Sequence, residues 1–316
     1  MPTPSEPRDA HLPVLPEAVL RSLAPEAGET YADATAGLGG HAAVIAERLG
    51  TNGRVVLNDL DRANLDRAVA RVRALAPSVQ IERVHGNFAE LPRGLEGLAC
   101  SADLVLADLG FASVHVDTPE RGFSFKRDGP LDMRYDTSRG ESASDLVHDR
   151  DEAELADVLW EFGEERRSRA IARAIVASRE RNGRIETTGR LADVVRSVVG
   201  GSSGGVDGAT RTFQALRIAV NDELGSLDAL LAAVGRAAAR TLRGEPAWLA
   251  PGARVGVISF QSLEDRRVKR AFGSIADRGH GEIASRRPIE ADADEVDANP
   301  RARSAKLRVI RLARPM

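Results

Sequence analysis

The chain has 316 residues, 42% of them hydrophobic, which is enough for roughly two domains or for one large domain with an insertion. Lys and Arg number 44 against 47 Asp and Glu, and a net charge of −3 excludes a globally basic RNA-binding protein, so any nucleic-acid surface must be local. One cysteine, Cys100, excludes internal disulfides, and the sequence predicts neither a signal peptide nor a membrane span, so we expect a cytoplasmic protein with no membrane association.

The first third of the chain alternates short apolar runs with helical segments. Four strands are predicted, over residues 31–34, 53–57, 79–84 and 102–107. Helices are predicted over residues 41–49 and 63–75, the second because Leu65, Val69 and Val72 recur at helical spacing. Strands that alternate with helices in this way indicate right-handed crossovers and a parallel, doubly wound sheet.

This alternation stops near residue 116, where a loop leads into helices. Three helices are predicted, over residues 151–162, 166–181 and 190–199. The Gly/Ser-rich stretch at 200–208 (GGSSGGVDG) is predicted to be a flexible link. No convincing strand is seen between residues 116 and 210.

The last third returns to the pattern of a sheet. We expect one long helical stretch over residues 212–239 and strands over 254–260 and 306–312. The simplest interpretation is an α/β fold in which one sheet is interrupted by a helical insertion. The predicted domains are a core in two parts, residues 1–115 and 212–316, and an inserted helical domain, residues 116–211.

A glycine-rich turn, DATAGLGGH (Asp33 to His41), follows the first predicted strand and opens a helix. Gly37 and Gly39 allow a sharp turn and a close approach of the backbone to a ligand. The helix N-terminus adds free N–H groups, and Asp59, at the end of the second strand, is placed to bind a ribose diol. The pattern indicates a nucleotide-like cofactor, although a turn of this kind also occurs without a ligand.

The residues around this turn favour S-adenosylmethionine over NAD. A dinucleotide fingerprint prefers a third glycine, and Ala42 stands in that place. A pyrophosphate would be repelled by the Asp33 carboxylate, whereas the ammonium group of S-adenosylmethionine suits it.

Three further positions are candidates for the same site. Phe88 follows the third strand and either stacks on an adenine or is an ordinary core aromatic. Asp108 ends the fourth strand, where parallel sheets place their active sites. His41 has no companion His or Cys at ligand spacing, so we expect it to form hydrogen bonds, and no metal site is predicted. Cys100 is expected to be a small core residue.

Five longer blocks stand along the chain in the order in which a known family carries them. They are RGFSFKRDGPLDMRYD (121–136), FGEERRSRAIARAIV (162–176), ATRTFQALRIAVNDEL (209–224), ISFQSLEDRRVKR (258–270) and NPRARSAKLR (299–308). With HLPVL (11–15) and the DATAGLGGH turn, they resemble the bacterial small-subunit (16S) ribosomal RNA cytosine-N4 methyltransferase H family (MraW-like).

This resemblance implies a Rossmann-like S-adenosylmethionine methyltransferase sheet with an inserted helical domain. It also implies methyl transfer to N4 of one cytidine in the decoding region of 16S ribosomal RNA. The expected partner is this RNA or the small ribosomal subunit, and a homodimer stays open. Matching positions carry the cofactor contacts onto seven residues, besides Asp33 and Gly37 of the turn: Gly39, Gly40, His41, Asp59, Phe88, Asp108 and His115.

The chemistry of the reaction suggests which residues assist it. The lone pair of a cytosine N4 is delocalised into the ring, so an acceptor for one N4 hydrogen would localise the lone pair and stabilise the developing positive charge. We assign this role to Asp108, assisted by the following loop as far as Ser113. No covalent nucleophile is required.

RNA contacts are expected in three places. The aromatics of residues 121–135 either stack on RNA or belong to a loop packed over the cofactor. Residues 166–184 hold seven Arg and one Glu, and residues 301–316 hold six basic residues and no acid, so phosphate contacts are predicted for both runs. The acidic stretch 290–297 is expected to be a mobile or partner-facing loop.

Two alternatives remain beside the RNA methyltransferase. One is a methyltransferase that acts on a small molecule or a protein, which the long family blocks disfavour. The other is a non-catalytic or altered-specificity ribosome-assembly or RNA-binding member of the family. This alternative stays open because the sequence departs from the family pattern at Phe111, Ala112, His115 and Gln261.

Overall fold

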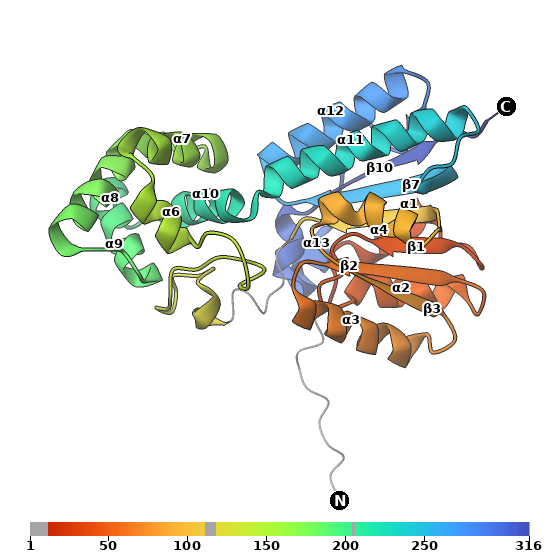
Figure 1. The fold of residues 1–316 in the computed structure, drawn as a ribbon, viewed down its shortest axis with the longest axis horizontal. Helices are drawn as coiled ribbons and strands as arrows, with labels where there is room; N and C mark the ends of the chain where they lie inside the picture. The colour runs from red at the N-terminus through yellow and green to blue at the C-terminus, as the bar shows by residue number, and fades with distance from the viewer. Residues whose placement is uncertain (1–11, 111–117, 204–205, 316) are drawn as a thin grey trace, which may run out of the picture. The chain divides into compact units, whose positions relative to one another are not determined.

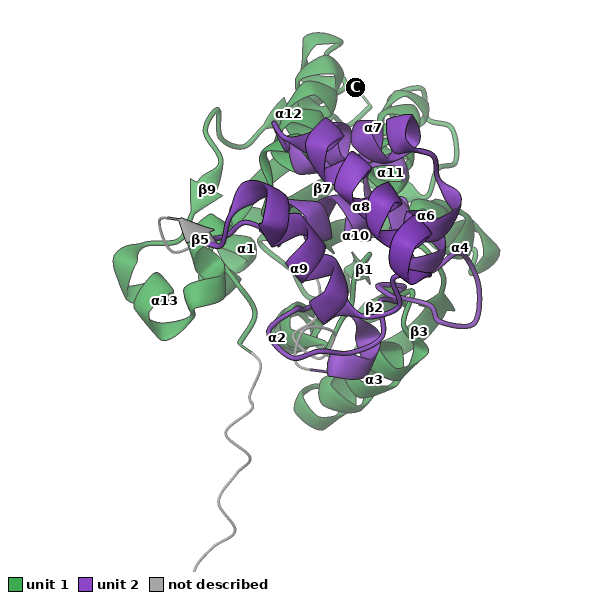
Figure 2. Cartoon of the chain, turned by 90° about the vertical axis from the view of Figure 1, so that its left-hand side faces the viewer, with its two compact units in different colours: residues 1–110, 226–316 green, residues 111–225 purple. Residues whose placement is uncertain are grey.

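The computed structural model describes residues 12–110, 118–203 and 206–315 (Figure 1). Its contacts divide the chain into two compact units, coloured separately in Figure 2. Unit 1 consists of residues 1–110 and 226–316, and unit 2 of residues 111–225. Unit 2 ends beyond the predicted boundary at residue 211, since Phe213 and Leu216 are buried in its own core.

An eight-stranded sheet forms the centre of unit 1, in the order β3-β2-β1-β4-β7-β10-β8, with β9 paired to β10. The bounds are β1 Thr30–Asp33, β2 Arg54–Asp59, β3 Gln80–His85, β4 Ala102–Asp108, β7 Leu249–Ser259, β8 Gly281–Ile283, β9 Ile289–Glu290 and β10 Lys306–Leu312. The first five strands of this order are parallel, and β10 runs antiparallel to β7 and β8. The predicted α/β class is confirmed, and the reversed last strand is an addition to it.

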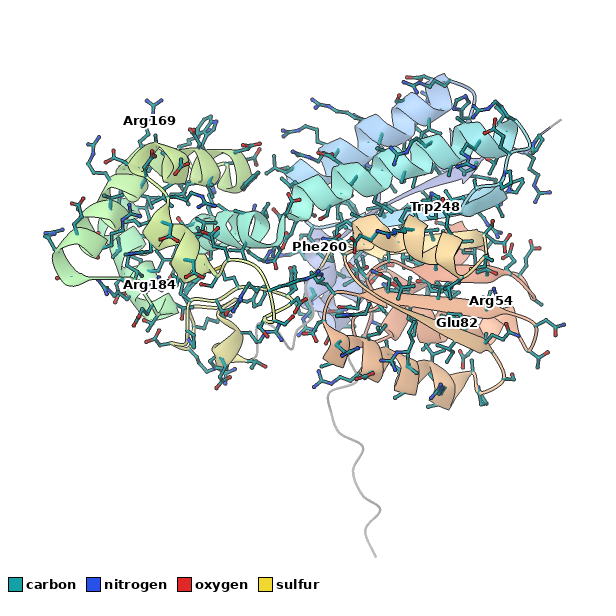
Figure 3. All side chains as sticks on the ribbon, viewed as in Figure 1. Arg54, Glu82, Arg169, Arg184, Trp248 and Phe260 are labelled. Carbon is teal, nitrogen blue, oxygen red and sulfur yellow. The ribbon has the colours of Figure 1, made fainter. Side chains whose placement is uncertain are left out.

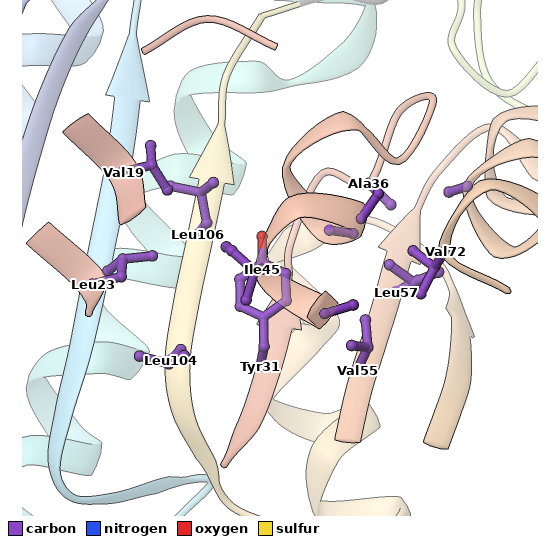
Figure 4. Close-up of a cluster of buried hydrophobic side chains, with 14 of the residues drawn as sticks. Val19, Leu23, Tyr31, Ala36, Ile45, Val55, Leu57, Val72, Leu104 and Leu106 are labelled. Atoms are coloured by element: carbon purple, nitrogen blue, oxygen red, sulfur yellow. The ribbon is translucent and has the colours of Figure 1, made fainter. Parts of the chain in front are cut away.

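Helices cover both faces of the sheet, as the alternation of side chains along each strand requires. One face packs α1 (Pro16–Leu23), α2 (Gly40–Leu49) and α3 (Arg62–Leu75); its core, with Val55 and Leu57 of β2, is drawn in Figure 4. The other face packs α4 (Leu91–Gly97), α11 (Glu223–Leu242) and α12 (Ser262–Asp277), and Val56 of β2 points to that side. The predicted stripe of Leu65, Val69 and Val72 is buried on α3.

Short elements complete unit 1: the 3₁₀ turns η1 (Phe88–Glu90) and η3 (Pro300–Ser304), and α13 (Ala293–Ala298). Residues 290–297, predicted to be a mobile or partner-facing loop, are therefore not a loop, because they hold the end of β9 and most of α13. The Asp292 side chain caps α13 by accepting the amide of Glu295, and Glu295 accepts the amide of Leu15. These acids serve capping and tethering, which a count of charges does not reveal.

Unit 2 is helical. It contains η2 (Pro119–Arg121), α6 (Ala143–Asp149), α7 (Glu152–Gly163), α8 (Ser168–Asn182), α9 (Thr188–Val199) and α10 (Thr210–Asn221). The three helices expected over residues 151–199 are confirmed. Ser142, Asp151 and Thr187 begin α6, α7 and α9 by accepting backbone amides, the usual way in which short polar side chains start a helix.

Two predictions at the end of unit 2 are wrong. The stretch 212–239 is not one helix, because Asp222 takes a left-handed conformation (φ 46°) that ends α10 before α11 begins. The stretch 200–208 is not merely a flexible link, since β5 (Ser202–Ser203) and β6 (Val206–Asp207) pair in antiparallel fashion. The Asp207 carboxylate accepts hydrogen bonds from Arg196 and from the Ala209 amide, which fixes the end of this hairpin.

The turn between β1 and α2 depends on two glycines for different reasons. Both have left-handed backbone angles, φ 51° at Gly37 and φ 75° at Gly39. A Cβ on Gly39 would lie 2.8 Å from the Ala68 Cα atom on α3, whereas a Cβ on Gly37 would meet, among the described residues, only the Thr35 carbonyl, at 3.9 Å. Gly39 is thus required by helix packing, and Gly37 leaves space above the turn.

We expect Gly39→Ala to be much more destabilising than Gly37→Ala. Both replacements incur about 1–2 kcal/mol for a left-handed alanine, and Gly39→Ala adds about 1–3 kcal/mol for the contact with the α3 backbone. Urea unfolding of the two variants and the parent measures both losses. Equal losses at the two positions would contradict this account of the turn.

Candidate active site

Three carboxylates stand at the carboxyl ends of neighbouring strands of unit 1. Asp33 ends β1, Asp59 ends β2 and Asp108 ends β4. Because β1 pairs in parallel with both β2 and β4, these strand ends meet at one edge of the sheet. Figure 3 labels Phe260, which follows β7, at this edge, and Arg54, which opens β2, toward the other end.

Asp33 is the most buried of the three, with 2% of its surface exposed. Its carboxylate accepts the Tyr31 hydroxyl at 3.0 Å and the Thr35 amide at 3.2 Å. Burial raises the pKa of Asp33 to about 7, and the nearby carboxylates of Asp108 and Asp59 act in the same direction, against the two hydrogen bonds. Near neutral pH this group is poised between its acid and its anion.

Asp59 braces the glycine-rich turn. One of its oxygens accepts the Gly37 amide at 2.7 Å, and the other accepts the Asp61 amide at 2.7 Å. The turn after β1 is therefore tied to the end of β2 by a charge-assisted hydrogen bond. A carboxylate oxygen can accept more than one hydrogen, so these bonds leave room for ligand hydroxyls.

Asp108 and His41 face each other, with His41 Nε2 3.8 Å from an Asp108 oxygen. About a quarter of the Asp108 side chain is exposed, and burial of the rest raises its pKa to about 6, opposed by a hydrogen bond from the Gly110 amide. Burial lowers the pKa of His41 to about 4, so the imidazole is neutral near pH 7 and the pair is not ionic. His41 Nε2 is buried and has no hydrogen-bond partner among the residues that the structure describes.

Two residues that the sequence analysis did not single out hold this edge together. Thr35 donates its amide to Asp33, and its hydroxyl accepts the Asp108 amide at 2.7 Å, which joins the ends of β1 and β4. Asn58 is fully buried and donates to the carbonyls of Ala34 and Gly86. The signals were present: Asp-x-Thr is a local turn pattern, and an Asn ending an apolar strand needs buried partners.

The remaining predicted residues are placed as follows. Phe88 follows β3 at the same edge, half-buried and packed against the core of the α11 face, which agrees with either of its two interpretations. Gly40 opens α2, and a Cβ there would lie 3.2 Å from Pro13. Ser113 and His115 lie outside the described residues. Cys100 is half-buried against the core of the α11 face.

The aromatics of residues 121–135 pack inside unit 2. Phe123 stacks on Tyr135 with ring centroids 5.2 Å apart, and Phe125 meets Phe213 edge to face at 4.6 Å. The Tyr135 hydroxyl donates to Glu223. These contacts give the rings a packing role within unit 2 that neither interpretation of the sequence had included.

The basic run 166–184 is also largely used within unit 2. Arg167 and Arg179 donate to backbone carbonyls, and Arg173 and Arg184 pair with Glu152 and Asp145. In the run 301–316, Arg308 pairs with Asp265 at 2.6 Å in a buried position. Both runs therefore supply structural bonds, and fewer of their side chains are available for phosphate than the sequence suggested.

Within the parts of the chain that the structure describes, no group of three or more His, Cys, Asp or Glu side chains is arranged to hold a metal ion. No helix in these parts is long and apolar enough to cross a membrane.

The electrostatics of the edge favour a cationic ligand. Asp33 and Asp108 form no salt bridge with any Lys or Arg in the described residues, and both carboxylates are destabilised by burial. A cation bound between them would recover the energy that burial removes. The open space above Gly37 and the unpartnered His41 Nε2 lie at the same turn.

Sheet order, glycine-rich turn and strand-end acids together define a Rossmann-like methyltransferase. The chain belongs to the MraW methylase family, whose model matches residues 8–313.

Two relatives illustrate the similarity along the whole chain. The ribosomal RNA small subunit methyltransferase H of Sorangium cellulosum is 46% identical, and the match covers 98% of this chain and 93% of the relative. The protein of the same name from Halorhodospira halophila is also 46% identical, over 95% of this chain and 93% of its own. Among solved structures, a putative rRNA-methylase from Clostridium thermocellum matches 94% of both chains with 11% identity and a TM-score of 0.42.

The raised pKa of Asp33 predicts a pH dependence of stability. The folded state holds this proton up to about pH 7, while the unfolded chain loses it near pH 4, so Asp33 destabilises the ligand-free fold as pH rises through that window. Replacing Asp33 by Asn removes this term. The free energy of unfolding of Asp33→Asn, relative to that of the parent, should therefore rise by on the order of 3 kcal/mol between pH 4 and pH 8.

Urea unfolding at several pH values measures this difference. Asp157→Asn, at an exposed position on α7, controls for the substitution itself. Parallel stability curves for the parent and Asp33→Asn would refute a buried, protonated Asp33.

Proposed function

We propose that this chain is an S-adenosylmethionine-dependent methyltransferase that methylates N4 of a cytidine in the decoding region of 16S ribosomal RNA. The observation that carries the proposal is a pair of carboxylates beside the glycine-rich turn, the buried Asp33 and the half-buried Asp108, which form no salt bridge with a Lys or Arg among the described residues. S-adenosylmethionine brings an ammonium and a sulfonium but no phosphate, which suits this surplus of negative charge.

Residues of unit 1 would hold the cofactor. Asp33, once ionised, offers a carboxylate to an ammonium group, and the open space above Gly37 admits a ligand to the backbone. Asp59 retains acceptor capacity for ribose hydroxyls, and the orphaned His41 Nε2 offers one more polar contact. Phe88 stays our proposed partner for the adenine, with Gly39 and Gly40 shaping the turn and His115 a further predicted contact.

When bound, the cofactor supplies an electrophilic methyl group. The task of the protein is to align the acceptor amine and to stabilise the charge that develops on it. Asp108 is suited to this task, because its pKa of about 6 leaves it ionised above neutral pH and the exposed quarter of its side chain is open to a ligand. In this proposal Asp108 accepts a hydrogen bond from the acceptor amine, and the lone pair of the amine nitrogen attacks the methyl carbon. We propose that Ser113, in the loop that follows Asp108, assists Asp108 in this role.

The RNA substrate is inferred from the relatives. Proteins that match nearly the whole of this chain are named ribosomal RNA small subunit methyltransferase H, and the family model spans both units. A base that is paired or stacked must leave its helix to reach a pocket at a sheet edge, so we propose that the cytidine is unpaired or flipped.

Calorimetric titration with S-adenosylmethionine tests the cofactor. Binding of a cation should ionise Asp33, so the affinity of the parent should rise from pH 6 to pH 8 and binding should release protons. Asp33→Asn should weaken binding at least tenfold and remove most of this pH dependence. An affinity that is independent of both pH and Asp33 would remove the carboxylate from the cofactor site.

The transfer itself is tested with Asp108→Asn, which keeps the size of the side chain and removes its charge. We expect kcat to fall by about 10²–10³, with a smaller loss of cofactor affinity than in Asp33→Asn. The assay follows tritiated methyl groups onto small ribosomal subunits that lack the modification, with mass spectrometry of the nucleosides to detect N4-methylcytidine.

Turnover of Asp108→Asn near the parent value would exclude Asp108 as the acceptor. A parent chain that binds cofactor but transfers no methyl group to the subunit would instead support the non-catalytic member of the family.

A further inference from the structure

A long open groove of about 930 Å³ runs between α11 and α12 on the outer side of unit 1. Figure 1 shows the two helices side by side over the sheet. The groove lies apart from the carboxylate edge, and the proposed methyl transfer makes no use of it. Besides its charged residues, the lining includes small side chains, such as Gly235 and Ala239 of α11 and Ala271 of α12, and the buried Leu231 and Ile275.

The walls of this groove are strongly basic. Exposed arginines line both sides, Arg236 from α11 and Arg266, Arg270 and Arg278 from α12 and its end, with His280 beyond them. The one acid in the lining, Asp228, already pairs with Arg267 at 3.2 Å. Within the described residues, Arg236, Arg270 and Arg278 form no salt bridge.

The arginines of α12 form a row. Arg266, Arg270 and Arg278 recur at multiples of four residues and extend over about 18 Å along the helix. A second hollow of about 610 Å³ is lined by the same three arginines, by Lys269 and by one acid, Asp277. Arg266 and Arg270 are four residues apart, and like charges at that spacing destabilise a helix, so helix stability does not account for this pair.

From these observations we propose that the α11–α12 groove binds the sugar-phosphate backbone of RNA that flanks the target nucleotide. This inference rests on the function proposed above. Arginine forks match phosphate oxygens, and a groove whose arginines extend over about 18 Å suits a strand rather than a compact anion. The net charge of −3 makes a local cationic row the expected form of an RNA surface in this chain.

The position of the groove fits such a strand. α12 begins at Ser262, three residues after β7 ends at Ser259, and β7 pairs with β4 up to Asp108 and Ile258. Leu263 and Asp228, near the starts of their helices, therefore lie toward the carboxylate edge, and Arg278 lies toward the opposite edge. A backbone laid along the row would lead away from the candidate site.

The test compares two triple variants of equal charge. Arg236→Gln, Arg270→Gln and Arg278→Gln together remove the groove cations. Arg48→Gln, Arg67→Gln and Arg73→Gln remove three exposed arginines from α2 and α3 on the opposite face of the sheet. Both are assayed as full-length protein for binding of a 16S ribosomal RNA fragment at several salt concentrations, for methyl transfer and for S-adenosylmethionine affinity.

We expect the groove variant to lose at least tenfold in RNA affinity and to raise KM for RNA, with S-adenosylmethionine affinity unchanged. The slope of log affinity against log salt should fall by about 2, for three single-strand phosphate contacts at about 0.7 each. The control variant should stay within about threefold of the parent in affinity.

Equal behaviour of the two variants, in a parent that methylates the subunit, would overturn the groove proposal alone. A groove variant that binds naked RNA like the parent but fails on intact subunits would overturn it in favour of an acidic protein surface. A parent that neither binds nor methylates the RNA would instead overturn the function on which the groove proposal rests.

Discussion

The burial of Asp33 without a counter-cation is the constraint on which the rest of the site depends. A parallel sheet gathers its strand ends at one edge, so acids that end β1, β2 and β4 are forced into proximity. Two hydrogen bonds, from Tyr31 and Thr35, offset only part of the loss of hydration at Asp33. The Asp33 carboxylate at this edge is therefore destabilised by burial, and a positively charged ligand would reduce that cost.

The surrounding hydrogen bonds hold the carboxylates and the glycine-rich turn in position before any ligand binds. Asp59 binds the Gly37 amide, Thr35 joins the ends of β1 and β4, and Asn58 links the turns after β1 and β3. Gly39 lets α2 approach α3 so closely that no side chain fits between them. A turn fixed in this way does not have to be ordered at the moment of binding, and the affinity gained is correspondingly larger.

The sequence predicted the part of the fold that local patterns encode. Buried stripes such as Leu65, Val69 and Val72 and the glycine-rich turn after Asp33 have a period or a composition that identifies them. The reversed strand β10 was recognised as a strand but not as antiparallel, because its partners β7 and β8 are distant in the chain. Long-range pairing leaves no local signal.

Helix capping and ion pairing were the other features that the sequence did not predict. The break at Asp222 between α10 and α11 depends on one residue in a left-handed conformation, and the α13 helix depends on the Asp292 cap. At the site, the carboxylates were found from strand ends, while Thr35 and Asn58 were not, because their roles are defined only by partners across the sheet. Composition alone also overestimated the free cations of the run 166–184, in which Arg167, Arg179 and Arg184 bind carbonyls and acids nearby.

Cofactor binding and RNA binding, as we propose them, require electrostatic potentials of opposite sign, and unit 1 places them on different surfaces. The carboxylate edge selects cations, and an anionic backbone brought directly onto Asp33 and Asp108 would be repelled. In our proposal, the exposed arginines of α12 and its end attract that backbone on the outer surface of unit 1, away from the carboxylate edge. Only a neutral base then has to enter the acidic edge.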